Sequence, residues 1–110
     1  MFEKDLKKAY LLDFYGDVLT ERKKEVLDMY YNEDLSLAEI AEQIGISRQG
    51  VRDLIKKAEE ELLFLEEKLG LAKKMSALRT HSDNMVRIAK ETDIPLSLKN
   101  EIERISEIIK

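Results

Sequence analysis

Cationic side chains recur at every fourth position near the middle of the chain. Arg48, Arg52 and Lys56 follow this spacing, and Gln49 stands beside them. Residues four apart lie on one face of a helix, so the spacing would gather the cations on one side. Arginine can bind a guanine edge through two hydrogen bonds, glutamine can bind adenine, and lysine can bind phosphate. The pattern is typical of a helix that binds nucleic acid, but an ordinary solvated helix face also carries it.

The candidate residues for nucleic-acid binding lie on this face or at its amino end. They are Ser47, Arg48, Gln49, Arg52, Lys56 and Lys57. Asp53 is the only acidic residue in the segment 47–57, whereas the whole chain of 110 residues carries a formal charge of −4. A protein with an acidic balance does not coat polyanions by bulk charge. We therefore expect a small, local basic site.

The side chains that most enzymes and metal sites need are scarce in this sequence. His81 is the only histidine, cysteine is absent, and no glycine-rich phosphate-binding loop occurs. Nucleophilic triads, zinc sites and nucleotide hydrolysis therefore have little to use. We expect no catalysis, no metal ion and no cofactor, and we expect His81 to be a surface or capping residue.

The elements that would position the cations are two helices joined by a turn in residues 37–56. Ser36 and Glu39 have capping-box spacing, in which each side chain accepts a hydrogen bond from the backbone of the other residue. Gly45 suits the positive φ of a turn, and Ser47 can cap the helix that follows. The spacing predicts one helix over residues 36–44 and a second that begins at Ser47.

A small residue is needed where two such helices cross, and Ala41 supplies it four positions before the turn. Apolar residues on both sides of the turn would form the wedge that fixes the angle between the helices. They are Ile40, Ile44, Ile46, Val51 and Leu54. Together these positions predict a helix-turn-helix. The alternative is a plain hairpin of two amphipathic helices that only pack.

Helical spacing continues through the rest of the chain. A first helix would bury every fourth residue of one stripe, which consists of Leu6, Tyr10, Phe14 and Val18. Further helices are expected after a cap at Thr20, from beyond Gly70 to about residue 90, and after a cap at Ser97. Gly50 should lie inside a helix, where alanine would stabilise the fold. The fold class is therefore all-α, a helical bundle that contains a helix-turn-helix and has additional C-terminal helices.

A stripe along the long helix after Ser47 has coiled-coil spacing toward its carboxyl end. It includes Leu62, Leu65, Leu69 and Ala72. The stripe can pack inside one chain or pair two chains. The helix that carries the candidate cations offers only three or four cationic contacts with nucleic acid. We therefore expect a homodimer that brings two such helices to the target, paired through this seam or through the C-terminal helices.

Two parts are expected along the chain: a helix-turn-helix domain with a long fourth helix over residues 1–74, and a C-terminal helical extension over residues 75–110 that packs on it. The sequence has no apolar run of about 18 residues, and its amino end mixes acidic and basic residues, unlike a signal peptide. We therefore expect a cytoplasmic protein that does not insert into a membrane.

Several linked motifs in the first part carry a family resemblance. They are Leu19-Thr-Glu-Arg22, Met29-Tyr-Tyr31, Asp34-Leu-Ser-Leu37, Glu39-Ile-Ala-Glu42 and Ser47-Arg-Gln49. In this combination, over about residues 1–74, the chain resembles the bacterial YlxM family. The core is also similar to region four of bacterial sigma factors, a winged-helix-like arrangement without a wing. In that region the corresponding helix reads promoter DNA in the major groove.

The resemblance implies a small cytoplasmic DNA-binding regulator that gene neighbourhood links to the signal recognition particle pathway. Double-stranded DNA is then the expected partner. The alternative is a non-catalytic accessory of the signal recognition particle that binds its RNA or protein components. Paired RNA has a major groove too narrow for a helix, so an RNA role would rely on phosphates and shape. DNA reading predicts dependence on base sequence, and the accessory role does not.

Overall fold

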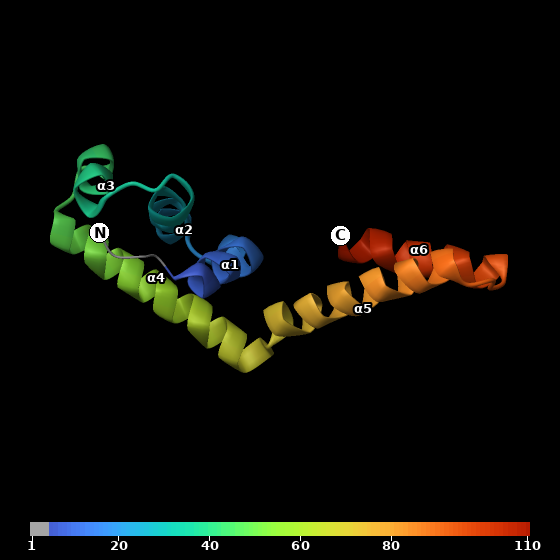
Figure 1. Ribbon diagram of the computed structural model, residues 1–110. Helices are drawn as coiled ribbons and strands as arrows, with labels where there is room; N and C mark the ends of the chain where they lie inside the picture. The colour runs from blue at the N-terminus through green and yellow to red at the C-terminus, as the bar shows by residue number, and fades with distance from the viewer. Residues whose placement is uncertain (1–4) are drawn as a thin grey trace. The chain divides into compact units, whose positions relative to one another are not determined.

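The computed structural model describes residues 5–110, which fold into six α-helices with no strand among them (Figure 1). The helices are α1 (Leu6–Tyr15), α2 (Glu21–Leu27), α3 (Leu37–Ile44), α4 (Arg48–Leu69), α5 (Leu71–Glu91) and α6 (Leu96–Ile109). A short 3-10 helix, η1 (Gly16–Val18), follows α1, and a π-helical turn, η2 (Asp28–Asn32), follows α2. The all-α fold class is confirmed.

Contacts divide the chain into two compact units, of which the first ends at Leu69 and the second is Gly70–Lys110. Gly70 adopts a left-handed conformation with φ of 62°, which interrupts the helix between α4 and α5. The predicted boundary after residue 74 and the packing of the extension on the domain stay predictions, and residues 1–4 of that domain lie outside the described part.

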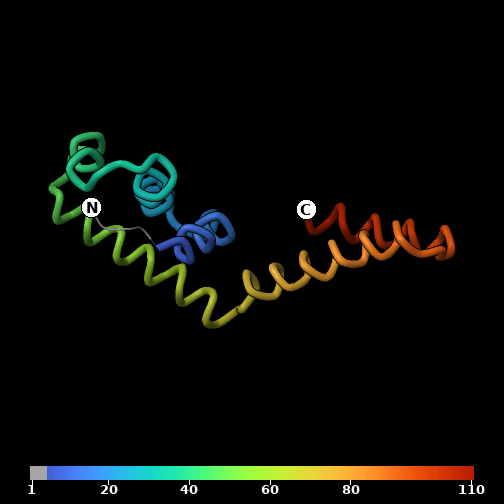
Figure 2. Tube along the Cα trace, viewed as in Figure 1, coloured from blue at the N-terminus to red at the C-terminus, as the bar shows by residue number. Residues whose placement is uncertain are grey.

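The first unit is built around α4, along which α1, α2 and α3 pack in succession, as the trace in Figure 2 also shows. One side of α4 is buried at regular spacing by Val51, Ile55, Ala58 and Leu62. Facing it, the core takes Leu11, Leu12, Tyr15, Val26, Leu27, Ile40 and Ala41 from the other helices. Because Leu62 is fully buried, this part of the predicted seam packs inside the chain.

The predicted buried face of the first helix was wrong. Leu6 is 83% exposed and Val18 is 61% exposed, whereas Leu11 and Leu12 are buried. Helix α1 ends at Tyr15, so Val18 falls in η1 and no longer continues the stripe. Two apolar stripes compete on this helix, and contact with α4 selects the second.

The start of α3 and the turn after it follow the sequence closely. The Ser36 hydroxyl accepts from the Glu39 backbone N–H at 3.1 Å, and the Glu39 carboxylate accepts from the Ser36 N–H at 3.0 Å. That hydrogen bond to the backbone holds the pKa of Glu39 below its ordinary value. Gly45 has φ of 75° and its N–H donates to the carbonyl of Ala41. The capping box, the left-handed turn and the buried Ala41 are thus all present.

The second unit is a hairpin of α5 and α6, which run side by side in opposite directions (Figure 1). Ser82, Ile102 and Ile109 are buried in it, and the Arg79 Nε donates to the Ile109 carbonyl at 3.0 Å. The predicted Ser97 cap is wrong, because α6 begins at Leu96 after Pro95 and Ser97 lies in its first turn. None of the helices described for residues 5–110 is long and apolar enough to cross a membrane.

Candidate nucleic-acid interface

The first three turns of α4 hold most of the candidate residues, and the buried stripe of the helix sets their orientation. Val51 and Ile55 face the core, so Arg52 and Lys56 are rotated toward solvent. All six candidate residues, from Ser47 to Lys57, are exposed. Ser47 caps the helix by accepting from the Gly50 N–H at 3.0 Å. The cap fixes where the helix begins and thereby where its first cation, Arg48, projects.

The four cations of this segment are not used by the fold. Within residues 5–110, no carboxylate forms an ion pair with the following side chains: Arg48, Arg52, Lys56 and Lys57. None of these four side chains is buried, and their charged groups lie in solvent. Exposed like charges without partners repel one another, and a polyanion that bound across them would relieve this repulsion.

Other cations of the first unit do have partners. Lys8 pairs with Glu59, Arg22 with Glu25, Lys23 with Glu61 and Lys24 with Asp17. The amino-terminal part of α4 therefore differs from α2, in which all three cations are paired.

Gln49 is held within the helix. Its Nε2 donates to the Asp53 Oδ1 at 3.0 Å, one turn further along α4. This hydrogen bond leaves the amide oxygen of Gln49 as an acceptor. A base edge that bound Gln49 through both amide atoms would first have to displace Asp53.

A hollow of about 170 Å³ adjoins the cations, and sequence reasoning missed part of its lining. Its walls are Tyr30, Leu37, Arg52, Ile55, Lys56 and Glu59. Tyr30 comes from η2 and Leu37 from the start of α3, so three elements meet beside the basic residues. The pKa of Tyr30 is raised, first by burial and then by the charge of Glu59. π-Helical turns are often found at functional sites, but no residue pattern in the sequence predicted this one.

Glu59 ties η2 and α1 to the middle of α4. The Tyr31 hydroxyl donates to its carboxylate, and the Lys8 ammonium lies 3.6 Å from the other oxygen. Burial raises the pKa of Tyr31 far above the ordinary tyrosine value, and the Glu59 carboxylate raises it further. The Lys8 ammonium offsets part of the charge of Glu59, which itself lines the hollow.

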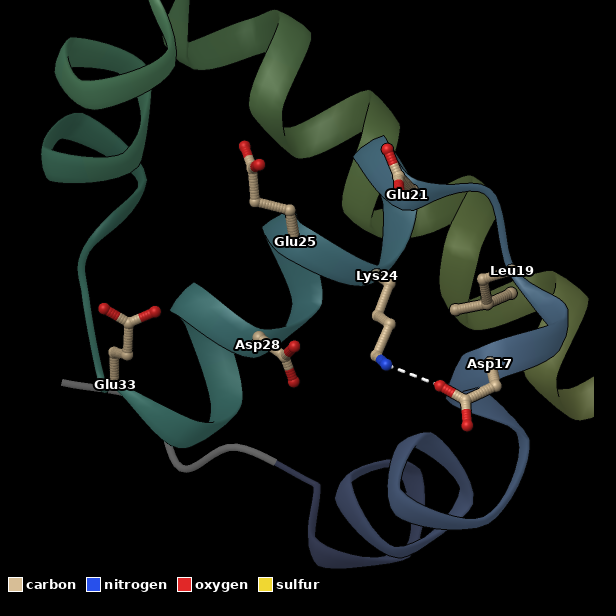
Figure 3. A pocket seen from close by; sticks show the side chains of 7 residues that line it. All are labelled: Asp17, Leu19, Glu21, Lys24, Glu25, Asp28 and Glu33. Atoms are coloured by element: carbon tan, nitrogen blue, oxygen red, sulfur yellow. Dashed lines mark hydrogen bonds and ion pairs between the residues drawn. The ribbon is translucent and has the colours of Figure 1, made fainter.

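A second hollow of about 480 Å³ is acidic and shares no residue with α4 (Figure 3). Its lining comes from η1, α2, η2 and adjacent positions: Asp17, Leu19, Glu21, Lys24, Glu25, Asp28 and Glu33. Lys24 reaches across to Asp17 at 2.5 Å, which lowers the pKa of Asp17 and raises that of Lys24. A nucleic-acid backbone would be repelled here. No group of three or more histidine or carboxylate side chains among residues 5–110 is arranged to hold a metal ion.

Comparison with known proteins gives a family match along nearly the whole chain. The family described as "Putative helix-turn-helix protein, YlxM / p13 like" (UPF0122) matches residues 2–108. The match therefore extends past residue 74, where the resemblance read from sequence motifs stopped, and includes α5 and α6.

Individual relatives agree with this match. A UPF0122 protein of Acetivibrio thermocellus is 45% identical over 108 residues, which cover 92% of each chain. One from Clostridium perfringens is 43% identical over 103 residues, again 92% of each chain. One from Caldanaerobacter subterraneus subsp. tengcongensis is 51% identical over 80 residues, 73% of this chain and 63% of the relative.

Proposed function

The chain belongs to the YlxM/p13-like helix-turn-helix family, UPF0122, and from that premise we propose that it binds double-stranded DNA through the amino-terminal half of α4. In this proposal α4 enters the major groove with Arg48 and Arg52 toward base edges. Lys56 and Lys57 bind phosphates on the flanking backbone. The protein is a non-catalytic regulator that acts in the cytoplasm and holds its target as a homodimer.

The observation that carries the proposal is the group of four cations without partners on one stretch of a helix-turn-helix. Among residues 5–110 they make no ion pair, whereas Lys8, Arg22, Lys23 and Lys24 of the same unit do. Even if three or four of these cations all contacted phosphates, the salt slope would be only about −3, which is low for specific binding by one copy. Two copies would double the contacts, which is the reason for including the dimer.

The hollow beside Arg52 and Lys56 supports a contact with the backbone on one flank of α4. Tyr30 and the amino end of α3 line it together with the two cations. A phosphate placed there would meet the Lys56 ammonium and the phenol of Tyr30, while Arg52 reaches past it toward the base edges. We therefore add Tyr30 to the residues proposed to contact DNA.

The test is a binding comparison on duplex DNA. Random duplexes are first selected for bound sequences, and the variants Arg48→Ala, Arg52→Ala and Lys56→Ala are then titrated at several salt concentrations. Each variant should lower affinity and reduce the magnitude of the salt slope by about 1 if its side chain contacts a phosphate. A variant whose side chain reads a base should also lose discrimination at one position of the site.

Arg22→Ala is the matched control, because it removes one positive charge from α2, away from the proposed interface. Its parent side chain lies 3.6 Å from Glu25 and is half exposed. The proposal is wrong if Arg22→Ala weakens binding as much as the α4 variants, or if all three α4 variants bind like the parent.

The signal recognition particle remains the competing partner, because unpaired cations also suit RNA phosphates. Titration of the particle RNA beside the selected duplex separates the two. Binding of that RNA in preference to every duplex, with no dependence on DNA sequence, would favour the accessory role and reject DNA reading.

A further inference from the structure

The hairpin of α5 and α6 carries an apolar face that nothing in its own unit covers. Four large aliphatic side chains on it are about half exposed: Leu78 (51%), Ile88 (50%), Leu98 (48%) and Ile105 (40%). Met85 lies among them and is half-buried. Scattered exposed leucines are ordinary on protein surfaces, but a contiguous group of this kind marks a surface that binds another.

Helix geometry places these side chains on one side of the hairpin. With about 100° per residue, Leu78 and Met85 lie within about 20° of each other around α5. Leu98 and Ile105 likewise lie about 20° apart around α6. Both pairs flank the line of contact marked by Ser82 and Ile102, and because the helices are antiparallel, the two flanks fall on the same side. The opposite side is polar, with Asp83, Arg87 and Glu103.

The second unit buries too little to hold this shape alone. The unit has only 41 residues, from Gly70 to Lys110, and its two helices share a thin layer of contact. Within this layer the hydroxyl of Ser82 has no hydrogen-bond partner. Domains this small usually need a disulfide, a metal ion or association with another chain. The sequence has no cysteine, and residues 5–110 hold no metal-binding group.

We infer that the apolar face of the α5–α6 hairpin is the dimer interface, and that its occupant is the same face of a second copy. Two such hairpins stacked by a two-fold axis make a four-helix bundle, in which both helices of each copy contribute apolar side chains. A surface needed for the stability of the unit requires an occupant that is always present. A second copy meets that condition, whereas a transient partner does not.

The size of the face allows a small interface with this occupant. Helix α6 has 14 residues and so extends about 21 Å, and two helices side by side are about 20 Å wide. The resulting projected footprint is about 400 Å², about half of the 800 Å² of accessible surface that one partner contributes to a standard interface. The second unit has eight basic and six acidic residues, a balance of +2 that opposes pairing only weakly.

The exposed large apolar residues of the first unit are spread over α1, η1, the turn before α4, and α4 itself. On the second half of α4 they are Phe64, Leu69 and Leu63, of which Leu63 and Phe64 point about 100° apart around the helix. Phe64 is also covered in part by the Lys68 ammonium, 5.7 Å from the ring centre.

Sedimentation at micromolar concentration tests the interface on the full chain. The parent should be a dimer, and Leu78→Glu or Ile105→Glu should weaken it by about 100-fold or more, because symmetry buries each new charge twice. Phe64→Glu is the matched control, with an exposed apolar residue replaced outside the hairpin, and it should stay dimeric. A monomeric parent, or dissociation by Phe64→Glu alone, would overturn the inference.

A second measurement covers the case in which a glutamate variant unfolds. The chain has no cysteine, so single thiols can be placed at will, as in Ile105→Cys and Phe64→Cys. Alkylation of the thiol at position 105 should slow as protein concentration rises, while that at position 64 should not change. Protection at position 105 that is independent of concentration would mean that the same chain covers the face, and the inference would be wrong.

The inference assigns an interface to the homodimer of the proposed function, and it does not depend on DNA binding. If Leu78→Glu is monomeric and still binds DNA weakly through α4, both proposals stand. If the parent is a dimer through the hairpin and binds no duplex, the interface stands and the DNA proposal fails.

Discussion

The two halves of α4 use their charges in opposite ways. In the carboxyl-terminal half, acidic side chains bind groups of the preceding helices: Tyr15 donates to Glu66 at 2.7 Å, and Lys23 donates to Glu61 at 2.9 Å. In the amino-terminal half, the cations have no ion-pair partner in residues 5–110. A single apolar stripe runs under both halves, so the difference is one of surface chemistry and not of burial.

This difference separates residues that hold the fold from residues that are free to bind. The acids of the second half, with Leu62 beneath them, fix α1, α2 and η2 against α4. The cations of the first half are then presented on a rigid helix, whose position is set without their help. A site on a rigid element needs little reordering when it binds, which favours affinity.

The largest expected effect is the loss of a core contact under the second half. Leu62→Ala leaves a cavity where a fully buried leucine packs, and should lower the free energy of unfolding by about 2 to 5 kcal/mol. Urea denaturation measures it. Leu63→Ala, at the neighbouring exposed position, should cost under about 1 kcal/mol. Equal costs at the two positions would mean that α4 does not turn Leu62 toward the core and Leu63 toward solvent.

A smaller effect is expected when the carboxylate that ties η2 to α4 is neutralised. Glu59→Gln removes the charge beside Tyr31 and the ion pair with Lys8, at a cost of about 1 kcal/mol. The pKa of Tyr31 should fall, because the carboxylate raises it, yet stay above the ordinary value, because burial is the larger cause. Ultraviolet titration of the tyrosines, with Tyr31→Phe to assign the change, measures this.

The sign of the pH dependence follows from that shift. A tyrosine with a raised pKa in the folded state stabilises the fold fully below its unfolded pKa, and this stabilisation is lost as pH rises beyond that value. The unfolding free energy of the parent should therefore decline in alkali more steeply than that of Tyr31→Phe. Parallel alkaline profiles for the two proteins would contradict the assignment.

Removing one cation from each region should distinguish the two uses of charge directly. Lys23→Ala breaks a partly exposed pair with Glu61 and should cost about 0.5 to 1 kcal/mol. Arg52→Ala makes the same change in net charge without breaking a pair, and should alter stability by under about 0.5 kcal/mol. Thermal melts at low and high salt measure both, and a larger loss for Arg52→Ala would erase the distinction.

The smallest effect concerns Gly50, which lies inside α4 as the sequence predicts. Alanine at such a position usually stabilises by about 0.4 to 1 kcal/mol, but its Cβ would lie 3.2 Å from the Ser47 Oγ and 3.3 Å from the Ile46 Cδ1. We therefore expect Gly50→Ala to stabilise by under about 0.4 kcal/mol. In an Ile46→Ala background one contact is gone and the gain should increase. An equal gain in both backgrounds would show that the contact is immaterial.

What the sequence determined by itself is the local structure around the turn. The capping box of Ser36 and Glu39, the left-handed Gly45 and the Ser47 cap each depend on residues three or four apart, so a short stretch of chain contains all the information. The alternating apolar stripe of α4 likewise set which of its residues face solvent, and with them the exposure of the candidate cations.

Only the tertiary structure decided which of two apolar stripes α1 buries, and which charges are left unpaired. Contacts such as Tyr31 with Glu59 and Tyr15 with Glu66 join residues 28 and 51 positions apart. Their formation depends on where helices meet, and no local pattern specifies that. The hollow that brings Tyr30 beside Arg52 has the same origin, because it exists only once η2, α3 and α4 have packed around one core.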